Sequence, residues 1–231
     1  MNYEIISSSS KGNCIIVEKF LMLDCGVSYK KIEKHLKNVK LIFISHIHSD
    51  HCNLTTIQKI AFNFPNIKFV IGSQEVAYAL LSNKIPSQNI FILVKEKWYD
   101  LGIVRMKLEM LQHDVWNYAL KWEYKQQLGL YATDTSSIDH IKAKNYNLYL
   151  IESNYREDIL QKHIEECEDY FQLNYLQRVE KTHLSYGQAN SFLIDNMGEH
   201  SQFQYIHQSQ WNFEEVERDE KHRFKNNSNG K

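Results

Sequence analysis

Short hydrophobic segments separated by turns run along most of the chain, with a few helical stretches between them. Residues 104–110 alternate between apolar and charged side chains, which is typical of a strand with one buried face. Residues 41–44 are all apolar and predict a buried strand. Repeated strands with few prolines favour two layered sheets in a mixed α/β or αββα domain. The expected strands cover residues 14–17, 20–23, 41–44, 67–71, 90–94, 104–110, 118–124, 128–132 and 148–151.

Apolar residues recur at helical spacing in two later segments, which we expect to form helices of an outer layer. The first segment covers residues 159–171, and the second follows Ser185. No repeat of 20 to 50 residues is visible, so solenoids and propellers are not expected. Residues 208–231 mix aromatic residues with dense opposite charges, and we expect a frayed tail there after one domain at residues 1–207.

The composition excludes several classes of protein. The 231 residues leave room for one sizeable core, and 8 Gly and 2 Pro beside 14 Tyr and 11 Phe exclude collagen-like and broadly disordered chains. The 27 Lys and Arg nearly balance the 28 Asp and Glu, for a net charge of −1. Selectivity for an anionic partner must therefore come from a site rather than from bulk charge.

Cysteine usage and the first residues bear on the compartment. The four cysteines form no C-x-x-C pair, in a chain too large to depend on disulfides. The start has no basic segment followed by an apolar core, and no apolar run approaches the roughly 20 residues that cross a bilayer. We therefore expect a reduced, cytoplasmic protein without a membrane partner.

The residues with the clearest chemistry follow the expected strand at 41–44. They are His46, His48, Asp50 and His51, in an H-x-H-x-D-H string. In extended backbone His46 and His48 point the same way, which suits two imidazoles on one divalent ion. Asp50 and His51 fall where the chain turns towards a helix, so they are available to a second ion. The string predicts two metal sites.

This string resembles the metal-binding motif of the metallo-β-lactamase superfamily, and later residues extend the resemblance. The resemblance implies an α/β fold, a single-domain, four-layer αββα sandwich with its metal ligands on loops at one edge of the two sheets. It also implies a further His, a bridging Asp and a final His, each after its own strand. His113, Asp134 and His183 match them in sequence order.

The resemblance assigns a role to each matched residue. One metal ion would be held by His46, His48 and His113, a second by Asp50, His51 and His183, and both would be bridged by Asp134. Asp50, Asp134 and His183 would be the catalytic residues. Asp24 matches the superfamily's first motif, an acid that supports the ligands through hydrogen bonds. Ligands without thiolate favour two Zn²⁺ ions, with Mn²⁺ as an alternative.

The remaining histidines match no ligand position of the superfamily, and most of them are expected to be solvated. They are His35, His140, His163, His200, His207 and His222. No residue is identified as the general acid that would protonate a leaving group.

Three further segments resemble the YycJ/VicX branch, which is allied to RNase Z and RNase J. They cover residues 7–14, 151–155 and 183–189. The branch implies a nuclease in which a hydroxide between two metal ions attacks a phosphodiester. Ser9 stands where the branch commonly has Gly, and Tyr186 where it usually has Asn. The chain also has no room for a β-CASP insertion, so RNase J-type processing is not expected.

Several polar residues outside the ligand set are candidates for substrate contacts. They are Ser9, Ser10, Asn13, Asn154, Ser185 and Tyr186. A cluster of lysines at residues 30–40 is either a nucleic-acid contact or the solvated face of an amphipathic helix. A homodimer is implied only by analogy with the superfamily.

Three functions stay open from the sequence. The first is a nuclease acting on DNA or RNA. The second is a phosphodiesterase acting on cyclic mononucleotides, similar to phage anti-Pycsar enzymes of the same superfamily, which the near-neutral charge and many tyrosines favour. The third is a non-enzymatic, metal-stabilised binding module, which the complete ligand set disfavours.

Overall fold

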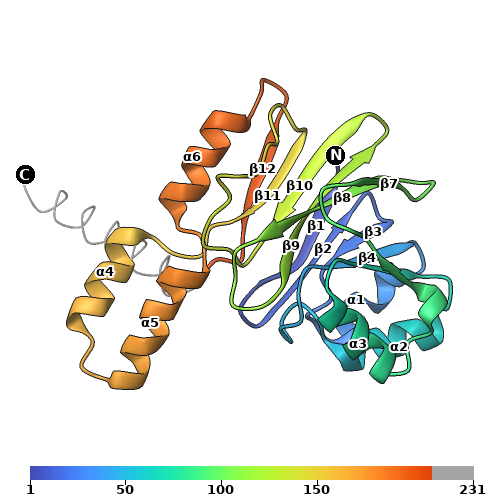
Figure 1. Cartoon of the computed structure of the whole chain (residues 1–231), viewed down its shortest axis with the longest axis horizontal. Coiled ribbons are helices and arrows are strands. Elements are labelled where there is room, and N and C mark those ends of the chain that lie inside the picture. The colour runs from blue at the N-terminus through green and yellow to red at the C-terminus, as the bar shows by residue number, and fades with distance from the viewer. Residues whose placement is uncertain (210–231) are drawn as a thin grey trace, which may run out of the picture.

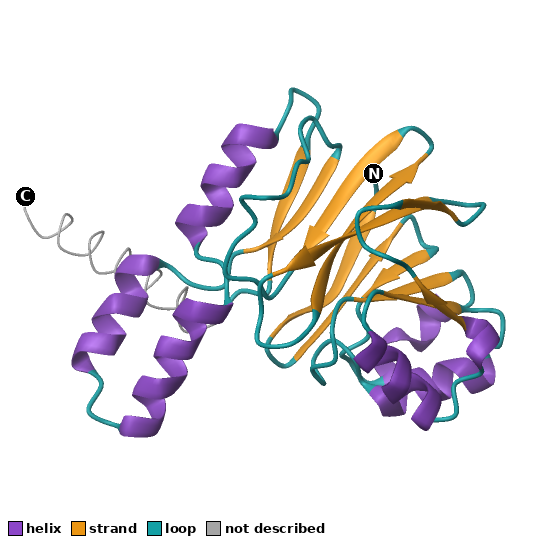
Figure 2. Ribbon diagram, in the orientation of Figure 1, coloured by secondary structure: helices purple, strands orange, loops and turns teal. Residues whose placement is uncertain are grey.

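The computed structural model describes residues 1–209, in which two mixed sheets pack face to face and helices cover both outer sides (Figures 1 and 2). The first sheet has the order β1 (Tyr3–Ser9), β2 (Gly12–Val17), β3 (Leu21–Leu23), β4 (Leu41–Ile44), β5 (Lys68–Ile71) and β6 (Ile90–Ile92). The second has the order β12 (Gln202–Ile206), β11 (Leu148–Glu152), β10 (Gln127–Ala132), β9 (Asn117–Tyr124), β8 (Arg105–Leu111) and β7 (Trp98–Asp100).

Each sheet contains an antiparallel part and a parallel part. In the first sheet β1, β2 and β3 pair antiparallel and β3 to β6 pair parallel. In the second sheet β12, β11 and β10 are parallel, and β10 to β7 are antiparallel. The carboxyl ends of the parallel strands lie at one edge of each sheet, where the loops that follow them can bring functional side chains together.

The helices form the two outer layers and a projecting hairpin. They are α1 (Tyr29–Leu36), α2 (Leu54–Asn63), α3 (Gln74–Ser82), α4 (Glu157–Glu166), α5 (Tyr170–Thr182) and α6 (Tyr186–Asn196), with a short 3₁₀ helix at Ser87–Asn89. Helices α1 to α3 cover the first sheet and α6 covers the second, whereas α4 and α5 pack on each other and project from the body (Figure 1).

Strand β4 shows how period-2 alternation makes the layers. Leu41 and Phe43 pack between the two sheets with residues such as Trp122 of β9, whereas Ile42 and Ile44 pack under helices α1 to α3. A four-residue strand that is apolar throughout therefore fills two separate cores. A third core lies between the second sheet and α6. The predicted four-layer αββα sandwich, formed as a single domain, is confirmed.

Some local predictions differ from the structure. Strands β1, β7 and β12 were not expected, since β7 has only three residues and polar residues lie among the apolar ones of β1 and β12. The predicted helix over 159–171 is wrong in its extent: α4 ends at Glu166, and Asp169 caps α5, accepting a hydrogen bond from the backbone N–H of Gln172 at 2.7 Å. The expected tail at 208–231 lies outside the described residues from 210 onward. No helix within residues 1–209 is long and apolar enough to span a bilayer.

Candidate metal centre

Side chains that can bind metal come from the ends of strands in both sheets. Asp24 follows β3, and His46 lies two residues after β4, both in the first sheet. His113 and Asp134 each lie two residues after β8 and β10, and His207 directly follows β12, all in the second sheet. The candidate centre therefore lies where the two sheets open at one edge.

The H-x-H-x-D-H loop is fixed by the loop that follows β3. The backbone N–H of Cys25 donates to the His51 carbonyl at 2.8 Å, and that of Asn13 donates to the Asp50 carbonyl at 2.7 Å. A Cβ added to Gly26 would lie 1.6 Å from the Asp50 carbonyl oxygen. Only glycine permits this approach, which sets the position of the whole ligand loop.

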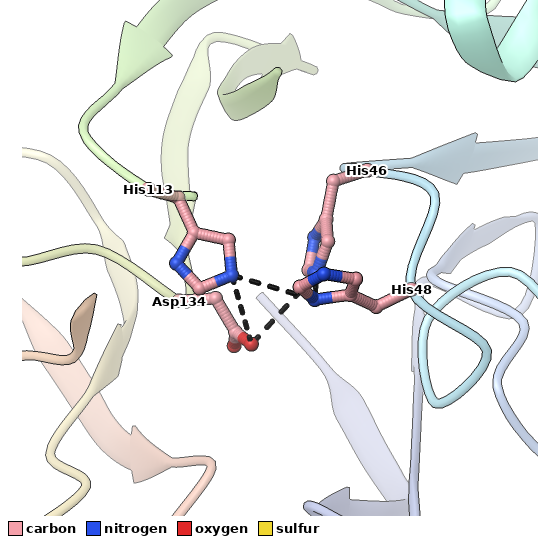
Figure 3. A group of neighbouring side chains, drawn as sticks. All are labelled: His46, His48, His113 and Asp134. Carbon is pink, nitrogen blue, oxygen red and sulfur yellow. Dashed lines mark hydrogen bonds and ion pairs between the residues drawn. The ribbon is translucent and has the colours of Figure 1, made fainter. Parts of the chain in front are cut away.

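The first group of potential ligands contains three imidazoles and one carboxylate (Figure 3). His48 Nδ1 lies 3.2 Å from His46 Nε2 and 3.4 Å from His113 Nε2. Asp134 Oδ2 lies 3.8 Å from His46 Nε2 and 4.0 Å from His113 Nε2. A tetrahedral Zn²⁺ ion with bonds of about 2.0–2.1 Å keeps its ligands about 3.3 Å apart, so these four atoms are spaced for one ion.

Hydrogen bonds on the outer side of the rings leave their inner nitrogens available. The Nδ1–H of His113 donates to the Thr182 carbonyl at 3.1 Å, because a carbonyl can only accept. The Nδ1–H of His51 donates to Asp24 at 2.5 Å. With these nitrogens protonated, each Nε2 carries a lone pair that a cation can bind. Asn13 Nδ2 lies 2.9 Å from Nε2 of His51, and Asp114 Oδ1 lies 3.1 Å from Nε2 of His113.

The second group pairs Asp50 and His51 with Asp134 and His207. His51 Nε2 lies 3.3 Å from Asp50 Oδ2 and 3.4 Å from Asp134 Oδ1. His207 Nε2 is buried without a hydrogen-bond partner among the described residues and lies 3.5 Å from Asp50 Oδ2. A buried, unpartnered imidazole nitrogen among carboxylate oxygens fits a metal ligand.

Asp134 joins the two groups, because Oδ2 faces the first and Oδ1 faces the second. Its side chain is buried and its backbone has φ = 50°. The left-handed conformation is uncommon except for Gly, Asn and Asp, and here it turns the carboxylate between the two sets of imidazoles. The arrangement fits two divalent ions that share one carboxylate.

The pKa shifts of the second group also indicate a site that favours positive charge. Burial alone would lower the pKa of His207, but Asp134, Asp50 and Glu152 raise it to about 10. Burial would raise the pKa of Asp50, but the neighbouring imidazoles of His207 and His51 outweigh it and hold that pKa well below its usual value. The effect of the carboxylates on the imidazole pKa is therefore larger than the effect of burial. Metal ions, when bound, would replace the protons that otherwise balance the carboxylate charge.

Asp24 has the contacts expected of a supporting acid. It is fully buried and accepts hydrogen bonds from the Ser45 backbone N–H at 2.8 Å and the Ser45 hydroxyl at 2.9 Å. It also accepts from His51 Nδ1 and, at 2.6 Å, from the Tyr131 hydroxyl. These bonds fix the carboxylate that orients His51, so the ring of that histidine has one accessible tautomer.

The structure places His207, and not His183, with Asp50 and His51. The sequence matched His207 to no ligand position, but this histidine is only 2% exposed and belongs both to the second group and to a third, with Asp134, Glu152 and His183. The sequence signal was its position directly after a strand, which is shared by the other ligands. That signal was missed because β12 was not predicted.

His183 lies beside the second group, in contact with Glu152. Its Nδ1 is 2.6 Å from Glu152 Oε1, and its ring stacks on that of His207 with centroids 5.3 Å apart. Burial lowers the pKa of His183, but the Glu152 carboxylate outweighs this and raises it above its usual value. Glu152 Oε2 is occupied by the backbone N–H groups of Thr135 and Leu184, so this carboxylate is held as an orienting group.

The predicted substrate contacts are placed very differently from one another. Asn13 is buried, and its Nδ2 lies 3.0 Å from the Ser9 carbonyl and 2.9 Å from His51 Nε2. Asn154 is buried too and donates to the His207 carbonyl at 3.0 Å. These two amides support the metal groups.

The other predicted contacts differ in exposure. Ser185 is buried as the N-cap of α6 and donates to Glu157, whereas Ser10 and Tyr186 are exposed and Ser9 is half-buried. Substrate contact by any of the six stays a prediction. Of the remaining histidines, His140 and His200 are exposed, and His222 lies outside the described residues.

The comparisons with known proteins agree with this architecture. No protein-family model matches the sequence, and a search of the curated proteins finds no match. The metallo-β-lactamase fold protein YhfI from Bacillus subtilis matches with a TM-score of 0.66 and 14% identity, over 89% of this chain and 85% of that one. The short form of human tRNase Z matches with a TM-score of 0.65 and 13% identity, over 91% of this chain and 93% of that one.

A third solved structure, Zn²⁺-bound PqqB from Methylobacterium extorquens, matches with a TM-score of 0.59 and 10% identity, over 90% of this chain and 89% of that one. Identities this low establish the fold alone. The chain therefore has the metallo-β-lactamase fold, with buried His and Asp groups at the edge of its two sheets that are suited to two metal ions. The finer resemblance to the YycJ/VicX branch stays a prediction.

Proposed function

We propose that this protein is a binuclear metal-dependent hydrolase that cleaves phosphodiester bonds in a nucleotide-containing substrate. The observation that carries the proposal is Asp134, which offers one carboxylate oxygen to each of two imidazole groups. His46, His48 and His113 would hold one ion, and Asp50, His51 and His207 the other. Two divalent ions, when bound, supply Lewis acidity to a phosphoryl group and lower the pKa of water. Zn²⁺ is our first choice, and Mn²⁺ the second.

His183 is the residue we assign to proton transfer. Glu152 binds Nδ1 of this ring, which fixes its orientation and leaves Nε2 as the nitrogen that can carry a proton to a leaving oxygen. The imidazole is partly exposed, unlike that of His207, so a substrate can reach it. This role fills the position of general acid that the sequence left unassigned.

The similarity to human tRNase Z supports a nucleic acid as the first candidate substrate, because that protein's name identifies it as a ribonuclease. A cyclic mononucleotide is the second candidate. It is favoured by Glu75, an acid without an ion pair among the described residues that lines the pocket beside the first metal group. Its carboxylate would repel the further phosphates of a long polyanion, but a cyclic nucleotide has only one phosphate.

A substrate panel tests the proposal. Metal-loaded wild-type protein is incubated with end-labelled single- and double-stranded DNA, with RNA and with 3′,5′-cyclic nucleotides, in Zn²⁺ or Mn²⁺ and in excess chelator. We expect metal-dependent cleavage of at least one class. The double variant Asp50→Ala, His51→Ala is the control and should lose turnover, whereas His200→Ala, on an exposed site, should retain it.

The results separate the three functions left open by the sequence. Cleavage of polymers supports a nuclease, and selective opening of cyclic nucleotides with polymers intact supports the second candidate. Turnover that the double variant or the chelator leaves unchanged would contradict the assignment of these metal groups as the centre. Metal binding with no turnover of any phosphodiester would leave a binding module and overturn the proposed activity.

A further inference from the structure

A pocket of about 460 Å³ lies directly beside the first metal group. Its wall includes His113, which is also a member of that group, together with Met110, Gln112, Trp116 and Glu75. The shared histidine makes the pocket continuous with the position that the scissile phosphate would occupy. A substituent on that phosphate can therefore reach this pocket.

Trp116 is the pocket's large aromatic side chain. It ends the loop of residues 112–116 that joins β8 to β9, and it is 56% exposed. The loop's two ends are fixed, since Leu111 is buried in the third core and Asn117 donates to the carbonyls of Thr133 and Asp134. An indole on a short, anchored loop loses little conformational freedom when a planar ring stacks on it. The Met110 thioether adds a polarisable neighbour for such a ring.

The pocket's two carboxylates are in different states. Asp114 Oδ2 pairs with Arg178 Nη2 at 2.9 Å, and its Oδ1 lies 3.4 Å from His48 Nε2. Glu75 has neither a side-chain hydrogen bond nor an ion pair within residues 1–209. The pocket therefore presents one uncompensated negative acceptor beside an aromatic face. That chemistry disfavours a second phosphate and suits an aromatic ring with N–H donors.

We propose that this pocket binds the nucleobase attached to the scissile phosphodiester, with Trp116 as its stacking platform and Glu75 selecting bases that carry an exocyclic amino group. The inference rests on the proposed function, which supplies the phosphodiester at the metal centre. Stacking on an aromatic side chain strengthens binding by about five- to a hundredfold per base. The subsite fits either a cyclic nucleotide or the nucleotide at a cleavage site of a polymer.

Binding of small probes to the metal-loaded protein tests the subsite without turnover. Dissociation constants are measured by calorimetry for adenosine 5′-monophosphate, for inosine 5′-monophosphate, which lacks the amino group, and for ribose 5-phosphate, which lacks the base. We expect adenosine monophosphate to bind at least about tenfold more tightly than ribose 5-phosphate. We expect it to bind about three- to tenfold more tightly than inosine monophosphate.

Three variants assign the effects to residues. Trp116→Ala should remove the advantage of adenosine monophosphate over ribose 5-phosphate, and Trp116→Phe should keep most of it. Glu75→Ala, which removes the acceptor, should abolish the preference for adenosine over inosine monophosphate. Trp98→Phe is the matched control, because Trp98 lies on β7 and does not line the pocket. It should change none of the three constants.

Equal binding of adenosine monophosphate and ribose 5-phosphate to the wild type would overturn the subsite. So would a Trp116→Ala effect that is the same for both probes, which would indicate a structural role. Hydrolysis of a dialkyl phosphodiester without a base separates this failure from that of the proposed function. If that substrate or any nucleotide is cleaved while the base effects are absent, only the subsite is wrong. If nothing is cleaved, the proposed function fails and the inference that rests on it fails with it.

Discussion

Three residues of the centre have backbone conformations that non-glycine residues seldom adopt. Asp24, Asp134 and His207 have φ values of 57°, 50° and 51°, and each comes at or just after the end of a strand. Asp and His are enriched in this left-handed region, where the backbone cost is about 1–2 kcal/mol per residue. Such a bend redirects the chain at the sheet edge and places the side chain in the centre. These residues are held there by their contacts.

His207 and His183 have separate roles that single substitutions can distinguish. We expect His207→Ala to bind about one metal ion per chain instead of two, because it removes a ligand from the second group. We expect His183→Ala to keep both ions and lose about a hundredfold or more in kcat, the usual range for a general acid. Inductively coupled plasma mass spectrometry measures the metal content of each variant, and steady-state kinetics measures its kcat.

The exposed His200 provides the control, since His200→Ala should change neither metal content nor kcat. If His183→Ala lost the second ion while His207→Ala kept it, the assignment implied by the sequence resemblance would be correct instead.

At the level of secondary-structure elements, helix α5 contributes to a metal group that lies outside its own layer. The Thr182 carbonyl at its end accepts from His113, and Arg178 pairs with Asp114. Asp114 Oδ1 lies 3.4 Å from His48 Nε2, the ring nitrogen that faces away from the first group. Helix α5 thus helps to orient two of the three histidines of that group.

Asp114→Ala should weaken binding of the first-group metal by about tenfold, the usual effect of removing a residue that orients a ligand. The free energy of unfolding should fall by less than about 1 kcal/mol, because the Arg178 pair is exposed. Chelator competition and urea denaturation measure the two quantities. Asp195→Ala, on the exposed face of α6, serves as the control. Equal metal affinity in both variants would contradict the role of Asp114 and its Arg178 partner in orienting His48.

A single carboxylate lies between two facing lysines of β8 and β9. Lys107 and Lys121 face each other in the register of these strands, and like charges in that position repel. Glu109 lies within 2.9 Å of the Lys107 ammonium and 2.8 Å of that of Lys121, which is buried. Burial would raise the pKa of Glu109, but the hydrogen bonds from both lysines outweigh it and lower that pKa.

We predict that Glu109→Gln lowers the free energy of unfolding by about 3 kcal/mol at pH 7, because it leaves a buried ammonium without its partner. A carboxyl whose pKa is lowered by folding contributes stability above its unfolded pKa of about 4.3 and loses it as the pH falls through the folded value. The difference from wild type should therefore shrink below about pH 4. Urea denaturation between pH 7 and pH 4 measures it.

The control for this prediction is Glu123→Gln on β9. Its carboxylate pairs with Arg105, whose side chain is about half exposed, so the substitution should cost less than about 1 kcal/mol. Equal losses in the two variants at pH 7, or a pH-independent loss in Glu109→Gln, would contradict this account.

At the scale of the whole molecule, the metal groups connect the two sheets. The first sheet supplies the H-x-H-x-D-H loop after β4, and the second supplies His113, Asp134 and His207. Ions bound only by the folded chain stabilise it, by about 4 kcal/mol at a thousand times the dissociation constant. The Tm of a chain of this size shifts by about 2–4 °C for each kcal/mol of change in the free energy of unfolding.

Removal of metal should therefore lower the Tm by about 10 °C or more, measured by calorimetry with Zn²⁺ and then with excess chelator. In Asp134→Ala the shift between the two conditions should be much smaller, because the shared carboxylate is gone. A wild-type Tm that is the same with and without metal would show that these groups do not hold ions in the folded protein.

The sequence by itself determined the layers and indicated most of the residues that the structure gathers at the edge of the sheets. Apolar runs such as residues 41–44 must be buried on both faces, so they predict central strands and, together, a sandwich. The spacing of His46, His48, Asp50 and His51 is local, and local spacing can be interpreted without knowing the fold. Positions 113 and 134 were found because each follows a segment with a clear strand pattern.

Only the tertiary structure decided which histidine completes the second group. Sequence order favours His183, but β11 and β12 are parallel neighbours, and their pairing delivers His207 to the edge beside Asp50 while Glu152 holds His183 next to it. Strand β12 is a five-residue edge strand with two glutamines among its apolar residues, so its sequence carries less strand signal than the fully apolar runs. The metal groups, the pocket beside them and the contacts with α5 each include residues distant in sequence, which chain packing brings together.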